Sequence, residues 1–358
     1  GGKLQQLTIE NEHPEVSFSS LWSKVWYENY EQPEYVWQSS ASTNEFEPKF
    51  SLTPLVFGTL KASFYAMLFA IPLALMGAAY TAYFMSPQLR KWVKPGIEIM
   101  AALPTVILGF LAGLWFAPWM EENLAGLFMM ILIIPPGLVV FAWGWHKLHV
   151  SDRLNLPEGW EPLLLVPALL GLGAVAMWVA DPVQGAMFGG DLREWLSNEA
   201  GISYDQRNAM VVGCAMGFAV IPTIFSIAED AVFGVPQTLS QGSLALGATP
   251  WQTMVFVILP TASPGIFSAL MIGLGRAVGE TMIVLMATGN TPVMDWNLFE
   301  GMRTLAANIA VEMPESEVNS SHYRILFLAG LVLFLFTFVV NTGAELIRQR
   351  LREKYSSL

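Results

Sequence analysis

Charged residues are scarce in this chain, and cysteine and histidine are nearly absent. Asp, Glu, Lys and Arg make up 13% of the 358 residues, whereas about 25% is usual for a soluble domain. Since 54% of the residues are hydrophobic, the composition excludes an ordinary soluble fold and favours a membrane protein. The single cysteine, Cys214, has no partner for an intrachain disulfide. The four histidines are scattered without metal-ligand spacing, so neither a metal nor a cofactor is predicted.

Two sequence signals are also missing. No GxxxxGK sequence followed by Ser or Thr occurs, so the chain is not expected to bind ATP through a P-loop. Residues 1–53 contain no basic segment followed by an apolar run, and therefore no signal peptide. We predict a membrane protein that is not an enzyme and has no nucleic-acid partner.

Long apolar segments make up most of the chain. A spanning helix needs about 20 mostly apolar residues, and the candidate spans are residues 55–84, 96–117, 124–145, 163–180, 208–227, 264–288 and 324–345. We therefore predict an all-α, polytopic helical bundle of about seven spans. It would comprise an acidic leader at 1–53, a transmembrane domain at 54–347 and a basic tail at 348–358.

The distribution of basic residues near the ends of the spans predicts the orientation in the membrane. With the polar segment 228–263 placed in the cytoplasm, the cytoplasmic segments hold Arg90, Lys91, Lys94, Lys147, Arg153, Arg348, Arg350, Arg352 and Lys354. This matches the excess of Lys and Arg in cytoplasmic loops, and it places the C-terminus in the cytoplasm. An odd number of spans puts the leader outside, so we expect a further spanning helix before Gly1. The leader is rich in Trp, Tyr and Glu and is expected to pack on the outer face.

The segment 228–263 predicts two short helices joined by a sharp turn. Pro236 suits a first helical turn, and no helix breaker occurs before Gly247, which suits a left-handed cap. Thr249 and Gln252 have capping-box spacing around Pro250. The second helix is expected to reach Leu259, and Pro260 to lead into the next span. This helix-turn-helix segment, which we call the elbow (residues 235–259), can enter a groove of a soluble partner. The alternative is an ordinary amphipathic surface loop.

The motif within this segment is Gln241-Gly242-Ser243, then Gly247, then Ile258-Leu259-Pro260. It resembles the EAA loop by which permease subunits of bacterial ABC importers bind their ATPases, with Gln-Gly-Ser in place of Glu-Ala-Ala. The resemblance assigns ATPase coupling to Gln241, Gly242, Ser243, Gly247, Trp251, Leu259 and Pro260.

Flanking segments are similar to phosphate-importer permeases of the PstC type: residues 228–236, 274–281, 287–292 and 303–305. This implies a type I ABC importer permease in the bacterial inner membrane. Its partners would be a homologous PstA-type permease, a dimer of ATP-binding subunits and a periplasmic phosphate-binding protein. Residues 118–204 have no counterpart in the usual six-span pattern, so they are expected to be an inserted helical hairpin.

Arg276 and Glu280 are opposite charges within a predicted span, four residues apart and so on one helix face. Charged residues inside a membrane usually face the bundle interior. One interpretation is an internal ion pair that locks the helix to a neighbour. The other is that Arg276 draws phosphate through the pathway, because a guanidinium matches phosphate oxygens bidentately, while Glu280 holds it in the absence of substrate.

Three other functions stay open. An importer of another oxyanion, such as molybdate or sulfate, would suit Arg276 equally well. An ion-coupled secondary transporter would need several ionisable or unwound polar positions at mid-membrane, and a single Arg/Glu pair gives it little support. A sensor or membrane scaffold would fit the long outer segments.

Overall fold

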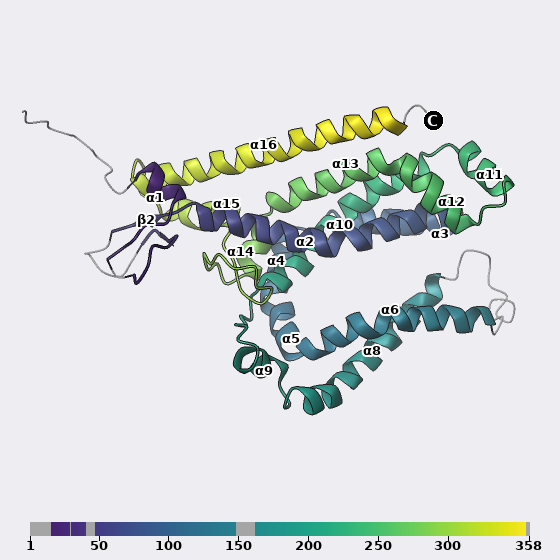
Figure 1. The fold of residues 1–358 in the computed structure, drawn as a ribbon, viewed down its shortest axis with the longest axis horizontal. Coiled ribbons are helices and arrows are strands. Elements are labelled where there is room, and N and C mark those ends of the chain that lie inside the picture. The colour runs from purple at the N-terminus through teal and green to yellow at the C-terminus, as the bar shows by residue number, and fades with distance from the viewer. Residues whose placement is uncertain (1–15, 29, 41–46, 148–161, 356–358) are drawn as a thin grey trace, which may run out of the picture.

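The computed structural model describes residues 16–28, 30–40, 47–147 and 162–355, and it is mostly helical (Figure 1). Its helices are α1 Phe18–Trp22, α2 Thr53–Ala79, α3 Pro87–Met100, α4 Thr105–Leu111, α5 Ala117–Glu122, α6 Leu124–Lys147, α8 Pro162–Met187, α9 Leu192–Asn198, α10 Ala209–Phe233, α11 Gln237–Ala245, α12 Pro250–Thr253, α13 Leu259–Val278, α14 Met282–Ala287, α15 Leu305–Glu312 and α16 Ser321–Tyr355. Short π-helical stretches follow three of them, at Tyr80–Phe84 (η1), Ala112–Phe116 (η2) and Met254–Ile258 (η3), and a 3-10 turn lies at Met313–Glu315 (η4).

Six of these helical segments are long and apolar enough to cross a membrane within the described part of the chain: Thr53–Phe84, Leu124–Trp145, Leu164–Asn198, Ala209–Phe233, Pro250–Val278 and Ser321–Leu351. A seventh candidate is the pair Pro87–Met100 and Thr105–Glu122, bent by 81°. The all-α, polytopic fold expected from the sequence is thereby confirmed. The elbow and the end of α16 lie at one end of the bundle and the leader at the other (Figure 1).

Two of the predicted spans were wrong in form. The span expected at 96–117 is broken at residues 101–104, because a proline at 104 disfavours helical geometry at Leu103. The span expected at 264–288 ends at Val278, and α14 begins separately at Met282. The same span begins earlier than expected, because α12, η3 and α13 form one continuous helix from Pro250.

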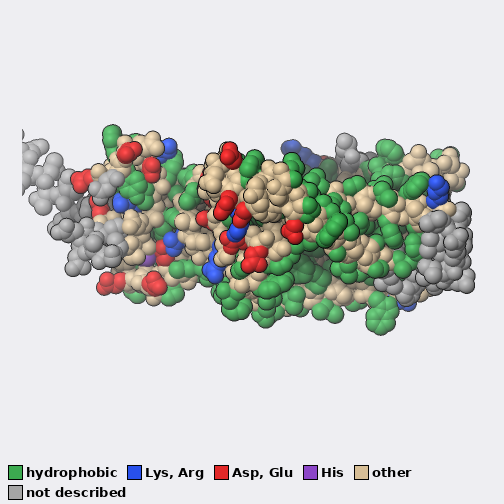
Figure 2. Space-filling model, turned by 90° about the horizontal axis from the view of Figure 1, so that it is seen from below, with side chains coloured by type: hydrophobic (Ala, Val, Ile, Leu, Met, Phe, Trp, Pro, Cys, Tyr) green, Lys and Arg blue, Asp and Glu red, His purple; other side chains and the backbone are tan. Residues whose placement is uncertain are grey.

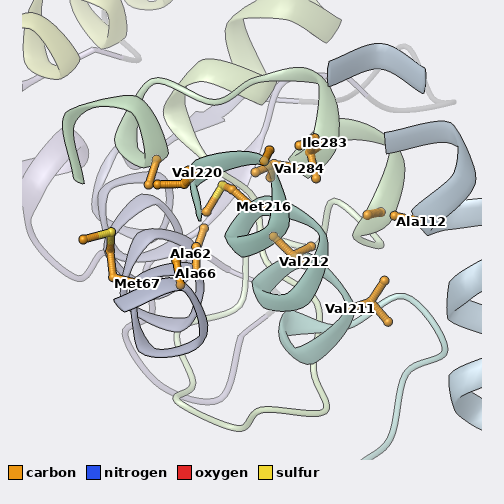
Figure 3. Packing of buried hydrophobic residues seen from close by; sticks show 14 of the residues in the cluster. Ala62, Ala66, Met67, Ala112, Val211, Val212, Met216, Val220, Ile283 and Val284 are labelled. Carbon is orange, nitrogen blue, oxygen red and sulfur yellow. The ribbon is translucent and has the colours of Figure 1, made fainter. Parts of the chain in front are cut away.

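The core lies between α2 and α10. On α2 a buried alanine recurs at every fourth position, at Ala62, Ala66, Ala70, Ala74 and Ala78. Figure 3 shows the first two facing Met216 and neighbouring side chains of α10. Small residues at this spacing let two membrane helices approach closely, and therefore α2 and α10 form the closely packed centre of the bundle.

Two glycines of the sequence Gly109-x-x-x-Gly113 bring α4 and η2 against α14. A Cβ atom on Gly109 would lie 2.7 Å from the carbonyl oxygen of Met282, and one on Gly113 would overlap the carbonyl oxygen of Met286. Only glycine permits this approach between main chains. These two positions therefore fix where α14 lies.

The described part of the leader packs on the ends of α15 and α16. Trp37 and Phe50 face each other across the short antiparallel strands β1 (Trp37–Gln38) and β2 (Lys49–Phe50). The Trp37 indole donates to the Glu312 carboxylate at 3.0 Å, and the Phe50 ring stacks on His322 with centroids 5.7 Å apart. Arg303 also donates to Glu312, at 2.6 Å. Buried polar and aromatic contacts thus hold the leader at this end.

Helices α6 and α8, within the predicted insertion at 118–204, pack against each other and lie below the main bundle in Figure 1. Seen from that side, hydrophobic side chains cover much of the surface, and most of the charged side chains lie toward its left end and centre (Figure 2). Residues such as Ile131, Val140 and Leu170 are more than 60% exposed. An apolar exposed surface of this kind suits lipid contact. His149 and Arg153 lie outside the described residues.

Candidate functional site

The elbow between α10 and α13 has the predicted helix-turn-helix form. Helix α11 ends at Ala245, and Gly247 follows with a φ of +89°. Thr249 caps α12: its hydroxyl accepts from the Gln252 amide at 3.2 Å, and the Gln252 side chain accepts from the Thr249 amide at 2.8 Å. Both cap bonds satisfy amides that the first helical turn leaves free. The local sequence therefore dictates the turn.

The continuation of the elbow differs from the expectation. Leu259 does not end a helix, and Pro260 lies in a continuous helix rather than at a break. The π-helical turn η3 directly before it changes the hydrogen-bonding pattern, which accommodates a residue without an amide hydrogen. The two residues are half-buried, so they support the elbow from behind.

The outer surface of the elbow is open and partly apolar. No residue of α11 is buried, and Leu246 and Trp251 are 91% and 68% exposed. Gln241 and Gly242 are exposed as well, while the Ser243 hydroxyl lies 2.9 Å from that of Thr253 and ties α11 to α12. Large apolar side chains on a rigid exposed turn are typical of an anchoring surface for a protein partner.

A cavity of about 250 Å³ lies under the elbow. It is lined by residues of η1, α10 and α11, among them Tyr83, Phe233, Gln237, Ser240 and Gln241. Gln241, which replaces the usual Glu, thus lies between the exposed surface and the helix bundle.

A change at Gly247 tests the turn. We expect Gly247→Ala to destabilise the elbow by about 1–2 kcal/mol, because an L-residue resists positive φ. Thermal unfolding of the purified protein measures the effect. Gly242→Ala is the matched control: it lies within α11 with no atom within 4 Å of its Cβ, so that change should leave stability equal or higher. Equal unfolding of both variants would contradict the role of Gly247.

Arg276 and Glu280 do not form the predicted pair. Helix α13 ends at Val278, so the two residues do not share a helix face. The Arg276 guanidinium donates to the Thr223 hydroxyl of α10 at 2.7 Å. Glu280 instead accepts from the free amides of Met282 and Ile283 at 3.2 and 3.3 Å. A carboxylate that caps the next helix competes with continuation of the first, which explains the break.

The sequence pattern missed two groups of polar residues. Thr223 follows Pro222 inside an apolar run, and that isolated hydroxyl was the available signal. The second group joins α3 to α10: Glu229 is fully buried and pairs with Arg90 and Lys94. Nearby, the Glu98 carboxylate accepts from the Ser226 hydroxyl at 3.5 Å.

Sequence comparisons find relatives among transport permeases. The chain is 28% identical over 316 residues to the phosphate transport system permease protein PstC of Xylella fastidiosa (88% of this chain, 79% of that protein). It is 26% identical over 306 residues to the probable ABC transporter permease protein YqgH of Bacillus subtilis (86% and 74%). It is also similar to the MetNI methionine ABC transporter in an inward-facing form, with a TM-score of 0.46 and 17% identity over 84% of this chain and 95% of that one.

The protein family described as binding-protein-dependent transport system inner membrane component matches residues 70–353. The match begins within the last part of α2 and covers α3 to α15, including the whole elbow, together with nearly all of α16. Because it extends over well more than half of the 358 residues, the chain belongs to the family of inner-membrane components of binding-protein-dependent transport systems.

Proposed function

We propose that this chain is the membrane-spanning permease subunit of an ATP-driven importer of inorganic phosphate. The observation that carries the proposal is the exposed, capped elbow at 235–259 in a chain of this family. The substrate is supported by relatives named as phosphate permeases over more than four fifths of the chain. The chain would form half of the translocation pathway and perform no chemistry of its own.

Family membership implies a substrate-binding protein and an ATPase in general. More specifically, we propose a PstA-type second permease, a dimer of ATP-binding subunits at the elbow and a phosphate-binding protein on the opposite side. The elbow, within segment 228–263, would then face the cytoplasm, as would the tail at 348–358. The leader at 1–53 would lie on the periplasmic side of the membrane, and residues 54–347 would form the permease domain.

Within the elbow, the exposed Gln241, Gly242 and Trp251 would contact the ATPase, with Gly247 setting the turn. In the pathway, Arg276 would contact phosphate. Glu280 would contribute by holding the start of α14 rather than by pairing with Arg276.

Uptake by a reconstituted complex tests the substrate. Proteoliposomes that contain this chain, its companion permease, ATPase and binding protein should accumulate radiolabelled phosphate only when ATP is supplied. Excess molybdate or sulfate should not compete. Competition by either would favour the oxyanion alternative, and uptake driven by a proton or sodium gradient without ATP would favour a secondary transporter.

A further inference from the structure

A buried cluster of charges joins α3 to the end of α10. Glu229 is 0% exposed. One of its carboxylate oxygens pairs with Arg90, and the other lies 2.8 Å from the Lys94 ammonium. Lys94 also lies 2.5 Å from the carboxylate of Asp230, which is largely exposed. We call these four residues the α3–α10 clamp.

The clamp makes α3 and the last turn of α10 a single unit. A buried carboxylate is stable only while its cations stay with it, so α3 cannot separate from Glu229 without exposing an unpaired charge. Arg90 also lies over the ring of Phe233, with its guanidinium carbon 3.6 Å from the ring centroid. Phe233 is the last residue of α10. Ionic and cation–π contacts therefore hold the same point from two sides.

That point is where the elbow is attached. Only Gly234, Val235 and Pro236 separate the end of α10 from α11. Phe233 and Val235 line the cavity under the elbow together with Gln241. Because the connection is short and includes a proline, which restricts the backbone, displacement of α11 is passed to the end of α10 and hence to the clamp.

The other end of α3 leads toward the candidate pathway. After the 81° bend, α4 packs its main chain on α14 at Gly109. Helix α14 in turn begins at the amides that the Glu280 carboxylate accepts from. A continuous set of contacts thus runs from the elbow through the clamp to the segment that follows Arg276.

From this arrangement we propose that the α3–α10 clamp transmits movement of the elbow to α4 and α14, with Arg90, Lys94 and Glu229 as positioning residues for coupling. The proposal rests on the proposed function, since it assumes that an ATPase moves the elbow. Loss of the clamp would leave the ATPase bound and hydrolysing ATP while less substrate is moved for each ATP.

The ratio of phosphate imported to ATP hydrolysed, measured in the reconstituted complex, tests the clamp. Arg90→Gln, Lys94→Gln and Glu229→Gln should lower this ratio by about 5-fold or more, the low end of typical coupling between sites, while the ATPase still copurifies. Arg90→Lys keeps the charge and should restore much of the ratio. Lys91→Gln is the matched control: Lys91 lies on the same helix but is exposed and outside the clamp, and the ratio should stay at the wild-type value.

The outcomes separate the two proposals. A wild-type complex that imports no phosphate would refute the proposed function, whatever the clamp variants do. A wild-type complex that transports, with clamp variants at the wild-type ratio, would overturn the clamp alone. If the Glu229→Gln subunit does not assemble with its partners, the ratio measured for Lys94→Gln tests the clamp instead, because that variant leaves Glu229 paired with Arg90.

Discussion

Gly113→Ala is expected to displace α14 and to abolish substrate uptake. The added Cβ would overlap the carbonyl oxygen of Met286 and lie 3.0 Å from its carbonyl carbon. Overpacking costs about 1–3 kcal/mol where side chains can move aside. Here the obstacle is main chain, so the cost should reach the upper part of that range. The gain of about 1 kcal/mol from placing Ala instead of Gly in a helix does not offset it. Thermal unfolding in detergent and uptake by proteoliposomes measure the two effects.

Gly144→Ala is the control for this change. Gly144 lies in α6, and its Cβ would have no atom within 4 Å, so the variant should unfold at the wild-type temperature or slightly above it. Wild-type stability and uptake in Gly113→Ala would show that α14 is not held by close contact with η2.

Local sequence rules predicted much of the fold. The apolar segments located the helices, and the Gly247, Thr249 and Gln252 pattern specified the elbow, because turn and cap chemistry depends on residues within a few positions of each other. The bend after Met100 was also encoded locally, by Leu103-Pro104. It was missed because the apolar composition continues across it, and a measure of hydrophobicity does not register a change of helix direction.

The charged partners could not be predicted in the same way. Glu229 and Lys94 are 135 residues apart in the sequence, and Arg276 and Thr223 are 53 apart. The spacing of Arg276 and Glu280 favoured a pair on one helix, but the break at Gly279 removes the shared face. Which charges meet depends on how whole helices pack, and the sequence of one helix does not contain that information.

The partner found for Arg276 changes what its replacement should do. Among the residues that the structure describes, its guanidinium donates to Thr223 and pairs with no carboxylate. Replacing Arg276 therefore leaves no buried acid unpaired, and the loss of stability should be that of a single hydrogen bond to a charged group, about 1.5–3 kcal/mol. An internal ion pair locking two helices would instead cost several kcal/mol when broken. Stability and transport thus separate the two interpretations of this residue.

Arg276→Gln is accordingly expected to fold, to assemble with its partners and to lose most phosphate uptake. A hydrogen bond between charged groups contributes about 1.5–3 kcal/mol, which corresponds to a decrease of about 10- to 150-fold in the uptake rate. Thr223→Val is the matched control, since it removes the same hydrogen bond and keeps the charge, and its uptake should fall far less. Initial rates of radiolabelled phosphate uptake at equal amounts of assembled complex give the comparison. Wild-type uptake by Arg276→Gln would remove Arg276 from the pathway, and equal losses in both variants would mean that the contact between α10 and α13, rather than the charge, supports transport.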